Sequence, residues 1–206
     1  MGKAAPGPSR GAVPDEDRHL IHKEDNVMEK KFLIAVDLQK DFIDGSLGTP
    51  EARAIVSAAA RRIRYCRENG WTVLATLDTH GPDYMDTPEG KKLPVPHCVR
   101  GTEGWALNPE IQSALSGCPA VEKPTFGSVR LPGIIRALTE DDSPLAIELI
   151  GLCTDICVVS NALLLKAHFP DASIRVNAAC CAGVTPEKHE AALEVMRSCQ
   201  IDVINA

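Results

Sequence analysis

The sequence lacks any apolar run long enough to cross a bilayer, and it does not open with the charged and then apolar segments of a secretory signal. We therefore expect no membrane span, no signal peptide and no membrane partner. It also lacks a basic run longer than a pair such as Arg61-Arg62, and its net charge is −6. This charge balance disfavours binding to nucleic acid or to an anionic membrane surface.

A paired Cys-x-x-Cys motif is absent too, although the chain has eight cysteines. They are Cys66, Cys98, Cys118, Cys153, Cys157, Cys180, Cys181 and Cys199. Without the paired spacing, a structural zinc ribbon is not expected. Because the cysteines are scattered through a chain long enough to fold without disulfides, the pattern favours a reducing, cytoplasmic location.

Two parts of the chain differ in composition. Residues 1–30 are rich in Pro, Gly, Ala and charged residues and show no periodicity, which predicts a disordered leader. Residues 31–206 have the length of one α/β domain, and the charged and apolar fractions of the chain are ordinary for a soluble protein. We therefore expect a single folded domain over residues 31–206.

Within that domain, short apolar runs alternate with helical patterns. Strands are predicted at residues 31–38, 71–77, 120–122, 145–150, 173–177 and 201–204, and helices at 51–69, 108–115, 131–139, 156–169 and 186–199. This alternation predicts a three-layer α/β/α fold with a six-stranded parallel sheet. Residues 78–108 show no clear pattern, and an irregular segment of that length is usually functional.

One strand and the helix after it offer a site for chemistry. Residues 145–150 read as a buried parallel strand, and Thr154 or Asp155 then provides a helix N-cap. Cys157 would lie in the first helical turn, just past the carboxyl end of the strand, where the helix dipole stabilises a thiolate. This position predicts a nucleophile, with the N–H groups of Cys153 and Cys157 binding an oxyanion. The alternative is that Cys157 is a buried core residue.

Charged residues end two other predicted strands. Asp37 ends the first and Lys123 follows the third, so both should lie at the same sheet edge as Cys157. Together they form a hydrolytic set in which a thiolate attacks a carbonyl or imine carbon, a carboxylate moves the proton and an ammonium offsets negative charge. Taken singly, they could be a turn residue, a solvated lysine and a core cysteine.

A second group of polar residues lies in the irregular segment. Asp78 and His80 directly follow the second strand, and on an extended segment their spacing places both side chains on one side. With His97 they can hold a divalent metal, and Glu89 could be a further ligand, direct or through water. The alternative is that the histidines only form hydrogen bonds within the loop.

Six motifs in order make the pattern recognisable. They are Asp37-Leu-Gln-Lys-Asp-Phe42 followed by Asp44-Gly-Ser-Leu, then Asp78-Thr-His80, His97-Cys-Val-Arg-Gly-Thr-Glu-Gly, Lys123-Pro-Thr-Phe126 and Gly151-Leu-Cys-Thr-Asp-Ile-Cys157-Val. In this order, over about residues 32–204, the sequence resembles the isochorismatase-like cysteine hydrolases, and within them the nicotinamidases most.

The resemblance implies the same fold, a six-stranded parallel sheet between helices. It implies that Asp37, Lys123 and Cys157 are catalytic. It further implies a cis peptide bond before Cys153, whose N–H would form the oxyanion hole beside that of Cys157.

The resemblance also implies a metal cofactor and a substrate. Nicotinamidases carry a divalent ion, commonly zinc, iron or manganese, on residues that match Asp78, His80 and His97, and some add a carboxylate at a position like Glu89. The metal is thought to hold the pyridine nitrogen of nicotinamide. In the mechanism that the resemblance implies, an acyl-enzyme forms on Cys157, ammonia leaves, and water releases nicotinate.

The wall that would contact the substrate ring departs from the family pattern. Many nicotinamidases have a Trp three residues before the late His, and here that position is Pro94. Phe42 and Trp105 are therefore the candidates for substrate contact, with burial as the alternative for Phe42.

Several functions fit this pattern. The first is hydrolysis of nicotinamide, and the second is hydrolysis of another small amide, such as a carbamoyl or ureido compound. A catalytically silent binding or assembly member of the family and a thiol redox protein using Cys153 and Cys157 are further alternatives. The intact set of Asp37, Lys123 and Cys157 favours an enzyme. Since family members are often dimers or tetramers, the resemblance also implies a homo-oligomer.

Overall fold

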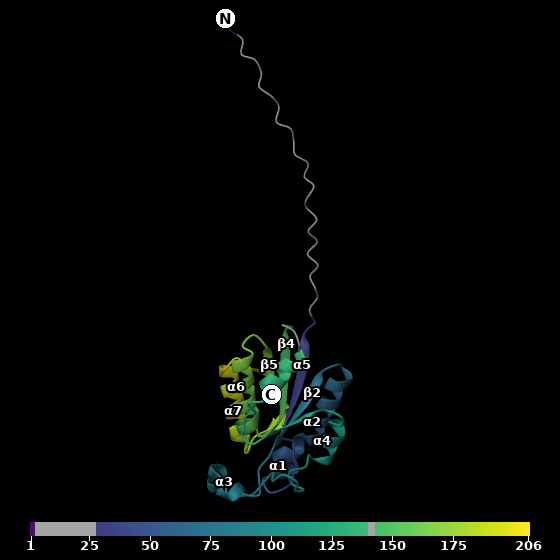
Figure 1. The fold of residues 1–206 in the computed structure, drawn as a ribbon, viewed down its shortest axis with the longest axis vertical. Helices are drawn as coiled ribbons and strands as arrows, with labels where there is room; N and C mark the ends of the chain where they lie inside the picture. Colours follow the sequence, from purple (N-terminus) through teal and green to yellow (C-terminus); the bar gives the residue numbers. More distant parts are fainter. Residues whose placement is uncertain (3–27, 140–142) are drawn as a thin grey trace.

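One parallel sheet organises the structure, a computed structural model that describes residues 1–2, 28–139 and 143–206 (Figure 1). The strand order is β3-β2-β1-β4-β5-β6, and each neighbouring pair is parallel. The strands are β1 (Lys30–Val36), β2 (Thr72–Asp78), β3 (Ala120–Lys123), β4 (Leu145–Leu152), β5 (Ser173–Ala182) and β6 (Asp202–Ile204). The predicted six-stranded parallel sheet is confirmed. Residues 3–27, most of the predicted leader, lie outside the described residues.

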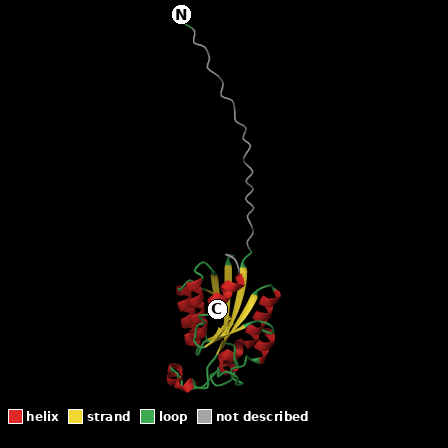
Figure 2. Ribbon diagram, in the orientation of Figure 1, coloured by secondary structure: helices red, strands yellow, loops and turns green. Residues whose placement is uncertain are grey.

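Helices cover both faces of the sheet, as Figure 2 shows in red around the yellow strands. They are α1 (Lys40–Ile43), α2 (Pro50–Glu68), α3 (Pro88–Lys92), α4 (Pro109–Ala114), α5 (Leu131–Thr139), α6 (Val159–His168) and α7 (Pro186–Ser198), with a 3₁₀ turn η1 (Tyr84–Asp86) and a π turn η2 (Thr154–Val158). Among the described residues, no helix combines the length and the apolar character that crossing a membrane requires.

The two faces of β1 explain how the core is divided. Phe32, Ile34 and Val36 pack into one cluster with residues of α5, α6 and α7. Leu33 and Ala35, which alternate with them, pack into the other cluster with residues of α2 and α4. Successive side chains of a strand point to opposite faces, so a strand buried on both sides reads as a continuous apolar run.

Local signals in the sequence position the long helices. The Thr49 hydroxyl caps α2 by accepting from the backbone N–H of Ala52, and Pro50 occupies the first helical position. Gly70 follows the helix with φ of +76°, the left-handed conformation that glycine adopts without strain. The predicted end of this helix at Gly70 is confirmed.

Four elements, α1, α3, β5 and η2, differ from the sequence prediction. The segment 78–108 is not irregular throughout, because Thr87 caps the short helix α3 within it. Helices of four or five residues, α1 and α3, are too short for a periodic pattern to reveal. Strand β5 continues to Ala182, beyond the predicted end at residue 177, through small residues that carry no strand signal. The helix predicted from residue 156 begins with the π turn η2 at Thr154.

A buried acid joins α2 to two strands of the sheet. Glu148 of β4 is fully buried, and its carboxylate accepts hydrogen bonds from Arg62 at 2.6 and 2.7 Å and from Arg175 at 2.9 Å. Both guanidinium groups lie 5.2 Å from the ring centre of Trp71. Burial would raise the pKa of Glu148, but the hydrogen bonds from Arg62 bring it below its ordinary value. The carboxylate is therefore ionised and paired.

We expect Glu148→Ala to lower the free energy of unfolding by about 1–3 kcal/mol, because it leaves two half-buried guanidinium groups without their partner. Urea unfolding measures the change. Glu194→Ala is the matched control, since Glu194 is a 72% exposed acid beside Arg197 at 3.4 Å, and an exposed pair contributes about 0–1 kcal/mol. Equal effects in the two variants would contradict the role given to the buried network.

Candidate active site

The carboxyl ends of four adjacent strands carry the polar residues of the site. Asp37 directly follows β1, and Asp78 and Lys123 are paired across β2 and β3 as the last residues of those strands. Cys157 lies in the turn η2, which follows β4. Because neighbouring parallel strands end at the same edge, side chains far apart in the sequence meet here.

The structure brings together Asp37, Lys123 and Cys157. The Lys123 ammonium lies 2.6 Å from Asp37 Oδ2 and donates a hydrogen bond to Cys157 Sγ at 3.3 Å. All three side chains are buried, with exposed fractions of 0%, 1% and 4% in chain order. A carboxylate, an ammonium and a thiol are therefore brought together in a buried site.

The two oxygens of the Asp37 carboxylate differ in their hydrogen bonding. Its Oδ1 accepts from the Thr76 hydroxyl at 2.7 Å. Among the described residues, Oδ2 accepts no hydrogen bond of regular geometry, although the Lys123 ammonium lies beside it. The Asp37 backbone is in the left-handed region with φ of +48°, a conformation that Asp tolerates better than most residues. A buried acceptor with an open lone pair can take a proton from a thiol.

Burial is the largest influence on the pKa values of Cys157 and Asp37. It raises the pKa of the Cys157 thiol well above the ordinary value, and the Asp37 carboxylate raises it further while Lys123 opposes. Burial also raises the pKa of Asp37, against the charge of Lys123. The resting nucleophile is thus a thiol that needs a base, and a carboxylate with a raised pKa is a stronger base than an ordinary one.

A buried cluster of Asp78, His80 and His97 lies next to Lys123. Asp78 Oδ2 is 3.0 Å from His80 Nε2 and 3.6 Å from His97 Nε2, and one ligand atom of each residue lies within 4.8 Å of the others. Glu89 Oε1, from α3, is 3.9 and 3.8 Å from the same two imidazole nitrogens. One carboxylate and two imidazoles at this spacing fit a divalent metal such as zinc, iron or manganese.

Gln39 fixes the backbone that carries this cluster. The Gln39 side chain is fully buried, and its oxygen accepts from the Asp78 N–H at 2.7 Å. Its amide nitrogen donates to the Asp78 carbonyl at 2.9 Å and to the Trp105 carbonyl at 2.9 Å. Sequence reasoning missed this role, and only the position of Gln39, two residues after Asp37, could have suggested it.

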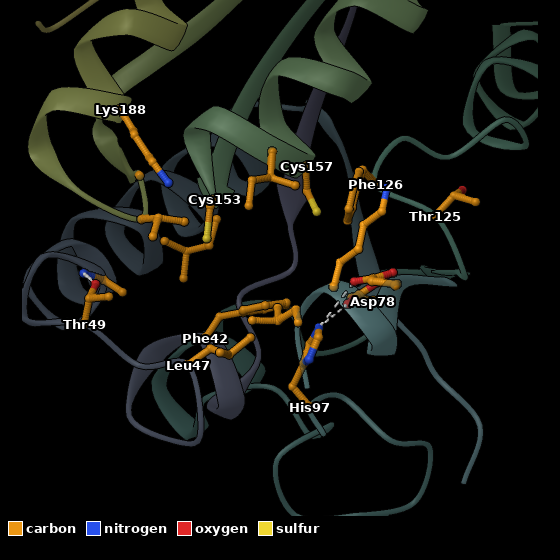
Figure 3. A pocket seen from close by; sticks show the side chains of 18 of the residues that line it. Phe42, Leu47, Thr49, Asp78, His97, Thr125, Phe126, Cys153, Cys157 and Lys188 are labelled. Atoms are coloured by element: carbon orange, nitrogen blue, oxygen red, sulfur yellow. Dashed lines mark hydrogen bonds and ion pairs between the residues drawn. The ribbon is translucent and has the colours of Figure 1, made fainter. Parts of the chain in front are cut away.

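A cavity of about 590 Å³ opens onto the sulfur and the cluster (Figure 3). Its wall includes Asp78 and His97 of the cluster, the neighbouring Glu89, and Cys153 and Cys157 at the turn η2. Apolar side chains make up much of the rest, namely Phe42, Leu47, Leu93, Phe126, Leu152, Ile156 and Val184.

The structure treats the two substrate-contact candidates differently. Phe42 lines the cavity, and its ring lies 5.5 Å from that of His97 at an angle of 59°. Trp105 is not among the described residues that line the cavity, and its indole N–H donates to the Thr79 hydroxyl at 2.9 Å. Sequence reasoning gave Phe126 no role, yet this 48% exposed ring also lines the cavity.

The turn with the nucleophile is tied to its surroundings. The Leu152–Cys153 peptide bond is cis, as the family resemblance implies. The Cys153 carbonyl accepts from the N–H groups of Ile156 and Val158, both at 3.1 Å. The side chain of Asn161 donates to the Cys157 carbonyl at 2.8 Å. These bonds hold the N–H groups of Cys153 and Cys157 in a fixed turn at the cavity wall.

Gly151 allows this turn to start close to β1. Its φ is +120°, and a Cβ at this position would lie 2.0 Å from the Val36 carbonyl oxygen. Only glycine fits such a close approach between two backbones.

A protein-family model and a curated protein both match most of this chain. The family model described as the isochorismatase domain matches residues 31–206. The nicotinamidase/pyrazinamidase of Mycobacterium tuberculosis is 28% identical over 197 residues, which cover 84% of this chain and 97% of that protein.

Solved structures are similar over the same part of the chain. The nicotinamidase/pyrazinamidase of Bacillus subtilis is 29% identical with a TM-score of 0.72, and the match covers 84% of this chain and 98% of that one. The Pyrococcus horikoshii pyrazinamidase in complex with zinc is 25% identical (TM-score 0.69, coverage 86% and 99%). The N-carbamoylsarcosine amidase of Thermoplasma acidophilum is 30% identical (TM-score 0.69, coverage 84% and 95%).

Proposed function

Because this chain belongs to the isochorismatase domain family, we propose that it is an amidohydrolase that converts nicotinamide to nicotinate and ammonia through an acyl-enzyme on Cys157. The observation that carries the proposal is the contact between Cys157 Sγ and the Lys123 ammonium at 3.3 Å, beside Asp37 and open to the cavity. Of the three buried residues, Cys157 lines the cavity, and Lys123 links it to Asp37 behind the wall.

In the first half of the reaction, Asp37 accepts the thiol proton and Cys157 Sγ attacks the amide carbon. The N–H groups of Cys153 and Cys157 hold the negative charge on the former carbonyl oxygen. Lys123 stabilises the carboxylate and the thiolate by charge. The C–N bond then breaks, and protonated Asp37 gives its proton to the leaving nitrogen, so that ammonia departs and a thioester remains.

In the second half, Asp37 takes a proton from water, and the resulting hydroxide attacks the thioester carbon. The C–S bond breaks, protonated Asp37 returns its proton to Cys157 Sγ, and the carboxylic acid product leaves as nicotinate and a proton. Asp37 thus acts as base and then as acid in each half of the reaction.

Asp78, His80 and His97 would hold a divalent metal, with Glu89 as a further ligand, direct or through water. When bound, such an ion supplies a Lewis acid that holds the ring nitrogen of a pyridine amide. The similarity to the zinc-containing Pyrococcus protein and the donor set support a metal cofactor. Phe42 supplies an apolar wall for the ring beside this cluster.

A second candidate is hydrolysis of a carbamoyl or ureido compound by the same residues. The similarity to the N-carbamoylsarcosine amidase favours it. So does Pro94, which stands where the family resemblance leads one to expect a ring-stacking Trp.

Substrate profiling with metal-replete protein separates the two candidates. We expect ammonia and nicotinate in equal amounts from nicotinamide, measured by an enzyme-coupled assay and by chromatography. Ammonia from ureido compounds, with none from nicotinamide, would favour the second candidate. No ammonia from either class would contradict an amidase.

The remaining parts of the proposal concern the cellular location, the oligomeric state and the domain organisation. All eight cysteines are free, which supports a reducing, cytoplasmic location. A homo-oligomer stays an expectation from the family resemblance, and light scattering tests it. Residues 31–206 would act as one hydrolase domain.

A further inference from the structure

A buried asparagine joins the turn that carries the nucleophile to the segment that follows Lys123. Asn161 lies in the first turn of α6, and it is 1% exposed. Its amide nitrogen donates to the carbonyl of Cys157 at 2.8 Å and to the carbonyl of Phe126 at 3.3 Å. Its side-chain oxygen accepts from the N–H of Ser128 at 2.9 Å. The chemistry proposed above gives this residue no role.

Only an amide side chain meets all three partners of Asn161. An asparagine offers two N–H donors and an oxygen acceptor, and the two carbonyls and one N–H around it match this set. A carboxylate here would place an oxygen against two carbonyls, and an apolar side chain would leave all three groups without this partner. Because buried polar groups without a partner are costly, the three bonds hold the amide in one orientation.

The segment after Lys123 therefore contacts the nucleophile at two points. Lys123 ends β3 and donates to Cys157 Sγ at 3.3 Å. Further along the same segment, the backbone of Phe126 and Ser128 reaches the Cys157 carbonyl through the amide of Asn161. The sulfur and the backbone carbonyl of the nucleophile are thus both tied to one stretch of chain.

This segment also packs closely on α6. A Cβ at Gly127 would lie 2.5 Å from Leu164 Cδ1 and 3.2 Å from the Ser160 carbonyl oxygen, so the backbone lies directly against the helix. Phe126 and Cys157 both line the cavity (Figure 3). The bonds of the asparagine therefore connect two parts of the cavity wall that come from different strands of the sheet.

We propose that Asn161 is a positioning residue for the nucleophile. By holding the Cys157 carbonyl against the segment that follows Lys123, it keeps Sγ beside the ammonium and aligned for attack on the substrate. It touches no reacting atom and acts through the backbone of Cys157. The inference rests on the proposed cysteine amidase function and names a residue which that function requires.

Two variants of the same shape test this role. In a helix, a threonine hydroxyl can donate to the carbonyl four residues earlier, which for position 161 is that of Cys157. Asn161→Thr can therefore keep the bond to this carbonyl. Asn161→Val cannot, because a methyl group stands in place of the hydroxyl.

The two variants should differ in kcat for ammonia release. A reacting group misplaced by about 1 Å can cost about 100-fold in rate, so we expect kcat to fall about 10- to 100-fold in Asn161→Val and to stay within about threefold of wild type in Asn161→Thr. KM should change less than about threefold in both, because neither variant touches Phe42 or the metal cluster.

Asn177→Val is the matched control. Asn177 of β5 is also a buried asparagine, and its amide donates to Glu148 at 3.2 Å and accepts from Asn205 at 3.1 Å. It is not among the cavity-lining residues. Its replacement should lower stability in urea unfolding and leave kcat at the wild-type value, which separates positioning from a general loss of packing.

Equal kcat in Asn161→Thr and Asn161→Val, or an equal loss of kcat in Asn177→Val, would overturn the positioning role and leave the proposed function in place. Asn161→Ala, which introduces a strong helix former, replaces Asn161→Val if circular dichroism shows that the valine variant does not fold. No ammonia from wild-type protein with either nicotinamide or ureido compounds would overturn both.

Discussion

Cys157→Ala should lower kcat for amide hydrolysis at least about 10⁴-fold, because removing the nucleophile of a group of residues that acts as a unit removes nearly all of their contribution. The sulfur is the only atom lost, and it lies 3.3 Å from the Lys123 ammonium at the cavity wall. Ammonia release measures the loss. Circular dichroism and metal analysis should show an unchanged fold and unchanged metal content, since Cys157 is outside the metal cluster.

Cys181→Ala is the matched control for this variant. Cys181 is also free and buried, in β5, but it does not line the cavity of the proposed site. Its replacement should leave kcat within about twofold, because a buried structural thiol acts as a small hydrophobic group. Near wild-type activity in Cys157→Ala would show that another group attacks the amide.

His80→Ala should abolish binding of the proposed metal and lower nicotinamide turnover by about 100-fold or more, since it would delete a proposed direct ligand. Even outer residues of metal sites contribute about 10–100-fold. Inductively coupled plasma mass spectrometry would measure the metal content of the variant. Chelation of wild-type protein should have the same effect, and added metal should restore turnover of the wild type only.

His168→Ala is the control for the histidine variant, because His168 is an exposed residue at the end of α6, outside the cluster. It should keep both metal and activity. Full activity in metal-free wild-type protein would contradict the role given to the cluster.

The main elements of the fold, and the meeting of Asp37, Lys123 and Cys157 at one edge of the sheet, could be predicted from the sequence for a physical reason. Apolar runs marked the strands, and parallel strands end at one edge, so Asp37, Lys123 and Cys157 could be expected to meet. The structure brings them together, with Lys123 Nζ 2.6 Å from Asp37 and 3.3 Å from Cys157. The Asp78 and His80 spacing indicated in the same way that these side chains lie together, and the structure places His97 beside them.

Residues whose role depends on distant partners were not predictable. Gln39 holds the backbone of Asp78, thirty-nine residues later in the chain, and a glutamine carries no sequence signal for such a bond. Lys188 is an exposed residue of α7, and only the packing of α7 against η2 brings it to the edge of the cavity. Tertiary contacts also determine that Trp105 binds Thr79 instead of lining the cavity.

The most direct test of the central claim is to intercept the acyl-enzyme with hydroxylamine during nicotinamide hydrolysis. Hydroxylamine attacks a thioester carbonyl, which frees the thiol and gives the hydroxamate of the substrate acid. We predict that wild-type protein forms this hydroxamate at the expense of nicotinate and that Cys157→Ala forms neither. Nicotinate formed at an undiminished rate with no hydroxamate, at any hydroxylamine concentration, would contradict a covalent intermediate on Cys157.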